Sequence, residues 1–251
     1  MKIIKVNNYT YIFILIAFLC GYIKNAIIIL IIVLIHELGH VFFIKRYNEK
    51  IINITIFPFG GITNIEKDIN TPINEELLIA SGGVIFQLFI YLFITFIPLT
   101  MHTKELMINY NTIIILFNLI PIIPLDGSII INCILNRFIS FTRSYIIKNI
   151  ISIITIVLFV IFNYKYSLNN YLIISFLIYK TCVSINNYKY IKYRFYLERY
   201  LNNYRYKRIK NNTKNINGLK LDTKHYFRIN KKVINEREKI QELFDKYKHF
   251  W

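Results

Sequence analysis

Long apolar runs dominate the chain, and short polar segments separate them. Several runs have few or no charged residues and are long enough to cross the hydrocarbon core of a bilayer, which takes about 20 residues in a helix. The pattern therefore predicts six membrane-spanning helices. Their approximate ranges are 6–23, 26–44, 77–98, 110–133, 146–163 and 168–187.

Composition agrees with this pattern. Of the 251 residues, 55% are hydrophobic and 18% are charged, whereas about 25% are charged in an ordinary soluble domain. The mean hydropathy is +0.42. These values exclude a free soluble enzyme and a disordered protein. Cys20, Cys133 and Cys182 lie in apolar segments with unrelated spacing, so neither a disulfide framework nor a cysteine metal site is indicated.

The distribution of charge predicts the orientation in the membrane. The segment 188–251 carries a net charge of +12 out of +17 for the chain. The predicted outer loops hold only Lys24, Lys104 and Lys165, and the other basic residues fall on the opposite side. Cytoplasmic loops are enriched in Lys and Arg. We therefore expect a multi-pass integral membrane protein with both termini in the cytoplasm.

Two regions depart from the apolar pattern. The segment IINITIFPFGGITNIEKD at 51–68 is rich in β-branched residues but interrupted by proline and glycine. It predicts a β-hairpin or a re-entrant loop, which at membrane depth must be buried in protein or line a wet cavity. The segment 188–210 interleaves Tyr with Lys and Arg, which is typical of an interfacial helix. The predicted fold class is an all-α polytopic membrane domain at 1–187 with this re-entrant element. A basic cytosolic tail follows at 188–251, made of the interfacial helix and a small C-terminal segment.

The second predicted span contains three polar residues that are costly in lipid. Its sequence HELGH places His36, Glu37 and His40 in an otherwise apolar helix. A charged group inside a span costs roughly 2.5–3.5 kcal/mol on insertion scales. His36 and His40 lie one turn apart on one face and can bind a single metal ion. Glu37 follows about 100° round the helix, close enough to take a proton from a metal-bound water. The alternative is a buried polar cluster that bridges helices.

A catalytic zinc site needs a third protein ligand and an open position. His102 lies on the predicted outer side, and His225 and His249 lie in the tail. Asp126 is the only carboxylate in the fourth predicted span. With the predicted orientation, it falls in the cytoplasmic half of the membrane together with HELGH, so the two can be level. The alternatives for Asp126 are a helix cap and a partner for a lysine.

HELGH at 36–40 and NLIPIIPLDG at 118–127, in this order and each within a span, resemble the active-site motifs of the site-2 protease family. This family consists of intramembrane zinc metalloproteases, peptidase family M50. The resemblance covers about residues 5–187. The span count, the FPFGG segment and the basic tail are similar to its sporulation branch, whose members release a sigma factor from its pro-form.

The resemblance implies a role for each motif residue. His36, His40 and Asp126 would ligate one zinc ion, and Glu37 would be the general base. Asn118 would line the substrate cleft, the alternative being an amide that caps or bridges helices. Phe59 and Gly60 would lie at the edge of the cleft and bind substrate. The substrate would be a protein with a membrane-associated pro-sequence, as in pro-sigma-K. Inhibitory membrane proteins are implied as partners, and the location would be the mother-cell membrane around the forespore.

The sequence departs from the family at several points. Ser128 stands where a second glycine is common. The third span reads SGGVIFQ without the usual Gly-Pro, which leaves Gln87 as a weak candidate for the site with a structural role favoured. The 64-residue tail is too short for a pair of nucleotide-sensing CBS domains. Nucleotide regulation is therefore not carried over.

Two other function classes compete with a protease. A divalent-metal transporter could use the same His and Asp ligands on facing helices, but it has no need for Glu37 as a base. It would also be favoured by internal hydropathy repeats, and none is evident. A basic, aromatic tail can bind nucleic acid. The tail contains no recognisable motif for this, so no nucleic-acid partner is predicted.

Overall fold

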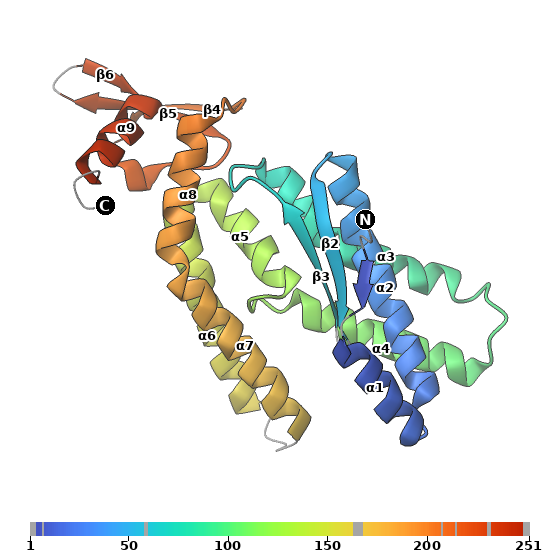
Figure 1. Cartoon of the computed structure of the whole chain (residues 1–251). Helices are drawn as coiled ribbons and strands as arrows, with labels where there is room; N and C mark the ends of the chain where they lie inside the picture. Colours follow the sequence, from blue (N-terminus) through green and yellow to red (C-terminus); the bar gives the residue numbers. More distant parts are fainter. Residues whose placement is uncertain are drawn as a thin grey trace. The chain divides into compact units, whose positions relative to one another are not determined.

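The computed structural model describes residues 4–6, 8–57, 60–162, 168–206, 208–213, 215–229 and 232–247. The chain forms two compact units (Figure 1). The first comprises 1–67 and 77–119, and the second comprises 68–76 and 120–251. These divisions differ from the predicted boundary between a membrane domain and a tail at 187/188, which stays a prediction.

The first unit combines apolar helices with a small sheet. Its elements are β1 (Ile4–Val6), α1 (Asn8–Leu19), α2 (Ile23–Arg46), β2 (Lys50–Phe57), β3 (Gly60–Glu66), the part of α3 (Ile73–Phe93) from residue 77 onward, and α4 (Met101–Leu119). Ile28 and Ile32 of α2 pack with Ile90 of α3, with Ile94 and with Met107 of α4. This apolar cluster holds the three long helices of the unit together.

The segment predicted to be a hairpin or re-entrant loop is a hairpin. Strands β2 and β3 pair antiparallel from Lys50 opposite Glu66 to Phe57 opposite Gly60, and β1 pairs parallel with β2 (Figure 1). The Lys50 ammonium and the Glu66 carboxylate are 2.8 Å apart at the exposed end of the pair. Phe59 lies outside the described residues. Re-entry of this hairpin into the membrane stays a prediction.

Among the residues that the structure describes, three helices are long and apolar enough to cross a membrane by length and composition, namely α2, α3 and α6 (Phe141–Phe162). The six predicted spans therefore remain a prediction. The range expected for the fourth, 110–133, is not one continuous helix. It contains the end of α4 at Leu119 and the start of α5 (Asp126–Phe138), with Pro121 and Pro124 between them. The break follows from proline chemistry, because proline lacks an amide hydrogen and restricts the residue before it.

The second unit joins apolar helices to a small mixed domain. Its further elements are α7 (Leu168–Asn186), α8 (Tyr188–Leu201), β4 (Arg208–Thr213), η1 (Ile216–Gly218), β5 (Thr223–Ile229), β6 (Lys232–Asn235) and α9 (Glu236–Tyr247). Helices α6 and α7 lie side by side (Figure 1). Ile156 of α6 and Leu177 of α7 pack with Ile122. Strand β5 pairs parallel with β4 and antiparallel with β6.

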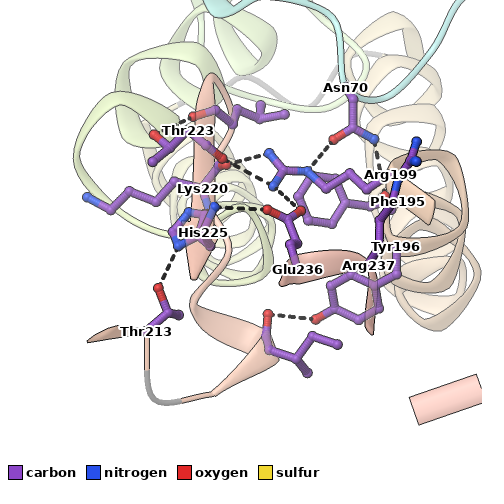
Figure 2. A network of polar contacts seen from close by, with 12 residues as sticks. Asn70, Phe195, Tyr196, Arg199, Thr213, Lys220, Thr223, His225, Glu236 and Arg237 are labelled. Atoms are coloured by element: carbon purple, nitrogen blue, oxygen red, sulfur yellow. Dashed lines mark hydrogen bonds and ion pairs between the residues drawn. The ribbon is translucent and has the colours of Figure 1, made fainter. Parts of the chain in front are cut away.

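A buried ion pair connects α8 to this sheet (Figure 2). Arg199 donates from Nη1 to Glu236 Oε1 at 2.6 Å and from Nε to Asn70 Oδ1 at 2.8 Å. The other Glu236 oxygen accepts the backbone N–H of His225 at 3.0 Å. Removing one partner of a buried ion pair typically costs about 3–5 kcal/mol. The pair therefore fixes the small domain against the N-terminal end of α3, since Asn70 lies just before that helix.

His225 is held as a neutral imidazole in the same network (Figure 2). The backbone N–H of Lys220 donates to Nε2 at 3.0 Å, so Nδ1 carries the proton and donates to Thr213 Oγ1 at 2.7 Å. Burial and the positive charges of Arg199, Lys210 and Lys220 lower the pKa of His225 to about 3.

Acidification should destabilise this domain. An unfolded histidine has a pKa near 6.5, so between pH 6.5 and 3 the unfolded chain binds more protons at His225 than the folded chain does. The resulting stability is complete above pH 6.5 and falls on acidification, by at most about 1.4 kcal/mol per pH unit. Circular dichroism melting of the full chain in detergent between pH 7 and 5 measures the slope. His225→Gln should flatten it, and an unchanged slope in that variant would contradict this assignment.

Candidate metal centre

The polar residues of the HELGH motif form a compact cluster on α2. Each of His36, Glu37 and His40 offers a ligand atom within 4.8 Å of the others. The Nε2 atoms of His36 and His40 are 3.1 Å apart. His36 is 5% exposed and Glu37 is 7% exposed, while His40 is half-buried. The helical spacing places these groups together without any contribution from elsewhere in the chain.

Two hydrogen-bond acceptors on α3 determine which ring nitrogen carries the hydrogen in His36 and in His40. His36 Nδ1 lies 2.8 Å from Gln87 Oε1, and His40 Nδ1 lies 2.7 Å from the carbonyl oxygen of Ile79. Both oxygens accept hydrogen bonds, so in each neutral ring the proton is on Nδ1 and the lone pair is on Nε2. The two Nε2 lone pairs then converge. Such an arrangement is repulsive unless a cation or a proton lies between them.

A second pair of hydrogen bonds orients Gln87. Its side-chain nitrogen donates to Asn111 Oδ1 at 3.1 Å, and the Asn111 amide nitrogen donates to the Gln87 backbone oxygen at 3.1 Å. Both side chains are fully buried. Because the amide nitrogen of Gln87 is engaged by α4, its oxygen must face His36. Partners of this kind fix the orientation of metal-binding histidines and raise their basicity.

Glycines allow α2 and α3 to approach closely enough for these contacts. A Cβ atom on Gly39 would lie 2.1 Å from the backbone oxygen of Gly82. A Cβ atom on Gly83 would lie 2.4 Å from His36 Cε1. Any side chain at these positions would force the helices apart. The space beside the His36 ring therefore exists only because residue 83 has no side chain.

The donor set fits zinc. Two imidazole nitrogens at about 2.0–2.1 Å from a tetrahedral zinc ion are roughly 3.3 Å apart. The 3.1 Å separation of the two Nε2 atoms is close to this value. Imidazole is a preferred zinc ligand, and the Nδ1 hydrogen bonds leave the correct nitrogens for coordination. His36 and His40 would therefore hold zinc, with Glu37 adjacent.

The remaining predicted site residues lie in different places. Asp126 is the first residue of α5 and belongs to the second unit, whereas HELGH belongs to the first. Asn118 is in the last turn of α4, and its side-chain nitrogen donates to the Ile114 oxygen of the same helix at 3.1 Å. Gly60 begins β3 opposite Phe57. The roles expected for these residues stay predictions.

Gln87 and Asn111 carry only a weak signal in the sequence. The sequence favours a structural role for Gln87, and its hydrogen bond to His36, a predicted metal ligand, is compatible with such a role. The available signal was polarity, because a glutamine and an asparagine in two apolar helices need partners when they are buried. The pair Gly82-Gly83 was a second signal, since adjacent glycines inside a helix mark close packing as much as flexibility.

Known proteins are similar to this chain over the segment that carries the motif. The model of the family described as peptidase family M50 matches residues 24–106, which include the whole HELGH motif. Stage IV sporulation protein FB of Bacillus subtilis (strain 168) is 30% identical over 149 residues, which are 57% of this chain and 52% of that protein. The chain is thus similar to peptidase family M50 over the segment that holds the motif.

Two further comparisons involve proteins of Methanocaldococcus jannaschii. A zinc metalloprotease is 32% identical over 125 residues, which are 47% of this chain and 36% of that protein. The solved structure of a site-2 protease matches with a TM-score of 0.50 and 24% identity, over 76% of this chain and 90% of that one. The latter shows a shared fold. The chain thus spans about half the length of the first curated relative and about a third of the second.

The hydrogen bond from His36 to Gln87 should strengthen zinc binding by this chain. Gln87→Leu removes the acceptor while keeping a side chain of similar size, so zinc affinity should fall about 10–100-fold. The measurement is the zinc retained by the purified full chain at increasing chelator concentration. Gln241→Leu, on the exposed side of α9, is the matched control. Equal zinc retention by both variants would show that Gln87 does not contribute to zinc binding.

Proposed function

We propose that the chain is an intramembrane zinc endopeptidase that hydrolyses a peptide bond in a membrane-associated protein. One observation carries this proposal. The Nε2 atoms of His36 and His40 converge at 3.1 Å beside the Glu37 carboxylate, on a helix long and apolar enough to cross a membrane. Three polar groups in such a helix are costly without a function. The similarity to peptidase family M50 over residues 24–106 supports the same chemistry.

Glu37 is the proposed general base. When bound, zinc would act as a Lewis acid that polarises the scissile carbonyl and activates water. The Glu37 carboxylate takes the proton of the attacking water and delivers it to the amine of the leaving peptide. Its burial keeps the proton from exchanging with bulk solvent during this transfer. The helical turn that it shares with His36 and His40 holds it at a fixed distance from both imidazoles.

Asp126 is the proposed third protein ligand. Between residues 106 and 187 it is the only acidic or histidine residue in the sequence. It stands at the start of α5, directly after the proline-containing break. A carboxylate is favourable at a helix N-terminus, and the break can leave its oxygens accessible to an ion. His36, His40 and Asp126 would provide the three ligands that a catalytic zinc site requires.

The hairpin offers a way to bind substrate in extended form. In the described sheet, β3 pairs with β2 on one side only. An unpaired strand edge can accept an extended peptide through main-chain hydrogen bonds. Peptide bonds in a helix are shielded, so an extended substrate is easier to cleave. Gly60 begins β3, and the proposed substrate contacts are Phe59, Gly60 and Asn118.

The proposed substrate is a sporulation sigma factor with a membrane-associated pro-sequence, as in pro-sigma-K. The similarity to stage IV sporulation protein FB supports this choice. Both termini would lie in the cytoplasm, six spans would cross the mother-cell membrane around the forespore, and inhibitory membrane proteins would regulate cleavage. A metal transporter is not favoured, because it would not need Glu37 beside the two histidines.

Loss of the base should abolish cleavage without removing zinc. Glu37→Gln keeps both imidazoles but cannot accept a proton, so cleavage should fall at least about 100-fold. Co-expression with tagged pro-sigma-K from the same organism, read by gel, measures cleavage, and metal analysis measures zinc. Glu105→Gln on the exposed face of α4 is the matched control. Equal product from Glu37→Gln and the control would refute the mechanism. No product from any variant would remove only the substrate assignment.

Asp126→Asn tests the third ligand. A neutral amide is a poor zinc ligand, so both cleavage and zinc affinity should fall, the latter at least about tenfold. Asp245→Asn on the exposed side of α9 serves as the control. This pattern differs from that of Glu37→Gln, which retains zinc. Full zinc retention in Asp126→Asn would place the third ligand elsewhere, with His102 the next residue to substitute.

A further inference from the structure

A pocket in the second unit carries a concentration of positive charge. It has a volume of about 480 Å³ and lies between the C-terminal end of α5, the first turn of α3, strand β4 and the segment before β5. Arg137, Arg208, Lys210 and Lys220 line it, and Asp222 is its only acidic lining residue. All these residues lie outside the predicted zinc site.

The positive charges in the pocket are not neutralised by protein carboxylates. Within the described part of the chain, none of the four basic residues forms a salt bridge. Arg137 donates to the neutral side-chain oxygen of Asn74 at 2.8 Å. Asp222 contributes one negative charge against these four positive charges, and its carboxylate accepts the backbone N–H of Ile73 at 3.1 Å. The pocket therefore has an unbalanced positive charge that favours an anion.

The surroundings of Lys220 show that three of these positive charges lie close together. The Lys220 side chain points away from the Arg199–Glu236 pair (Figure 2), and its ammonium donates to the backbone oxygen of Phe138. Burial and the nearby positive charges of Lys210 and Arg208 lower the pKa of Lys220. An anion among these three residues would relieve their mutual repulsion.

A buried donor also lines the pocket. Asn136 is 1% exposed, and its side-chain oxygen accepts a hydrogen bond from the Ser144 hydroxyl. Its side-chain nitrogen has no hydrogen-bond partner among the described residues. A buried donor without an acceptor is destabilising. An oxygen-rich ligand in the pocket would supply the missing acceptor.

The position of the pocket in the sequence places it near the membrane surface. Ile73 and Asn74, which line it, are the first residues of the candidate span α3. Asn136 and Arg137 end α5 only a few residues before the candidate span α6. Basic residues next to spans attract the anionic headgroups of the cytoplasmic leaflet.

We propose that this pocket binds a phosphate-bearing anion, and that the headgroup of an anionic phospholipid is its source. The guanidinium of Arg137 and the ends of Arg208, Lys210 and Lys220 would contact the phosphate oxygens. Arginine and lysine are the side chains that bind phosphate best. A bound headgroup would tie the small C-terminal domain to the membrane surface beside the ends of two candidate spans.

Binding of short-chain lipid to the purified full chain in non-ionic detergent tests the proposal. Dihexanoylphosphatidylglycerol should bind, and zwitterionic dihexanoylphosphatidylcholine should bind at least about tenfold more weakly. The variant Arg208→Gln/Lys210→Gln removes two exposed charges from one face of β4. The loss of two basic residues should weaken phosphatidylglycerol binding roughly tenfold to thirtyfold. Microscale thermophoresis measures each dissociation constant.

The matched control removes the same charge from outside the pocket. Arg205→Gln/Arg228→Gln changes two exposed arginines of the same unit and should keep wild-type affinity. Equal weakening in both double variants would show a general charge effect and overturn the pocket. If inorganic phosphate binds as tightly as the lipid, the pocket binds phosphate but a phospholipid is not its specific source. Equal affinity for the two lipids would overturn the proposal altogether.

Discussion

The convergence of two imidazole lone pairs inside an apolar helix is the constraint on which the site depends. His36 and His40 are placed by helical spacing alone, but the direction of their lone pairs is fixed by acceptors on α3. Those acceptors reach the rings only because Gly39, Gly82 and Gly83 let the two helix backbones come into contact. The glycines are thus as necessary for metal binding as the ligands, although they touch no metal.

The first unit illustrates how a polar network can be stable among apolar helices. Gln87 and Asn111 bond to each other as well as to His36 and the backbone. A buried amide with its hydrogen bonds satisfied costs little, whereas an unsatisfied one is expensive. The network links α2, α3 and α4, and the apolar cluster around Ile32 packs the same helices together. The polar network and the apolar cluster therefore hold the same three helices together.

The second unit depends on a different polar contact. The buried pair of Arg199 and Glu236 joins α8 to the start of α9 and, through Asn70, to the segment before α3. Charges are expensive to bury singly, so the pair specifies one arrangement of these segments. The basic residues of the tail therefore have different roles. Arg199 is structural, whereas Arg208 and Lys210 face a pocket.

The sequence by itself predicted the apolar helices, a hairpin or re-entrant loop at 51–68 and the metal-binding character of HELGH. These are local properties, because helical spacing, β-branching and proline chemistry act over a few residues. Only the tertiary structure decided that Gln87 and Asn111 support His36, that glycines set the distance between α2 and α3, and that four basic residues from distant segments meet in one pocket. Such contacts join residues far apart in the chain, and no local pattern records which of them will meet.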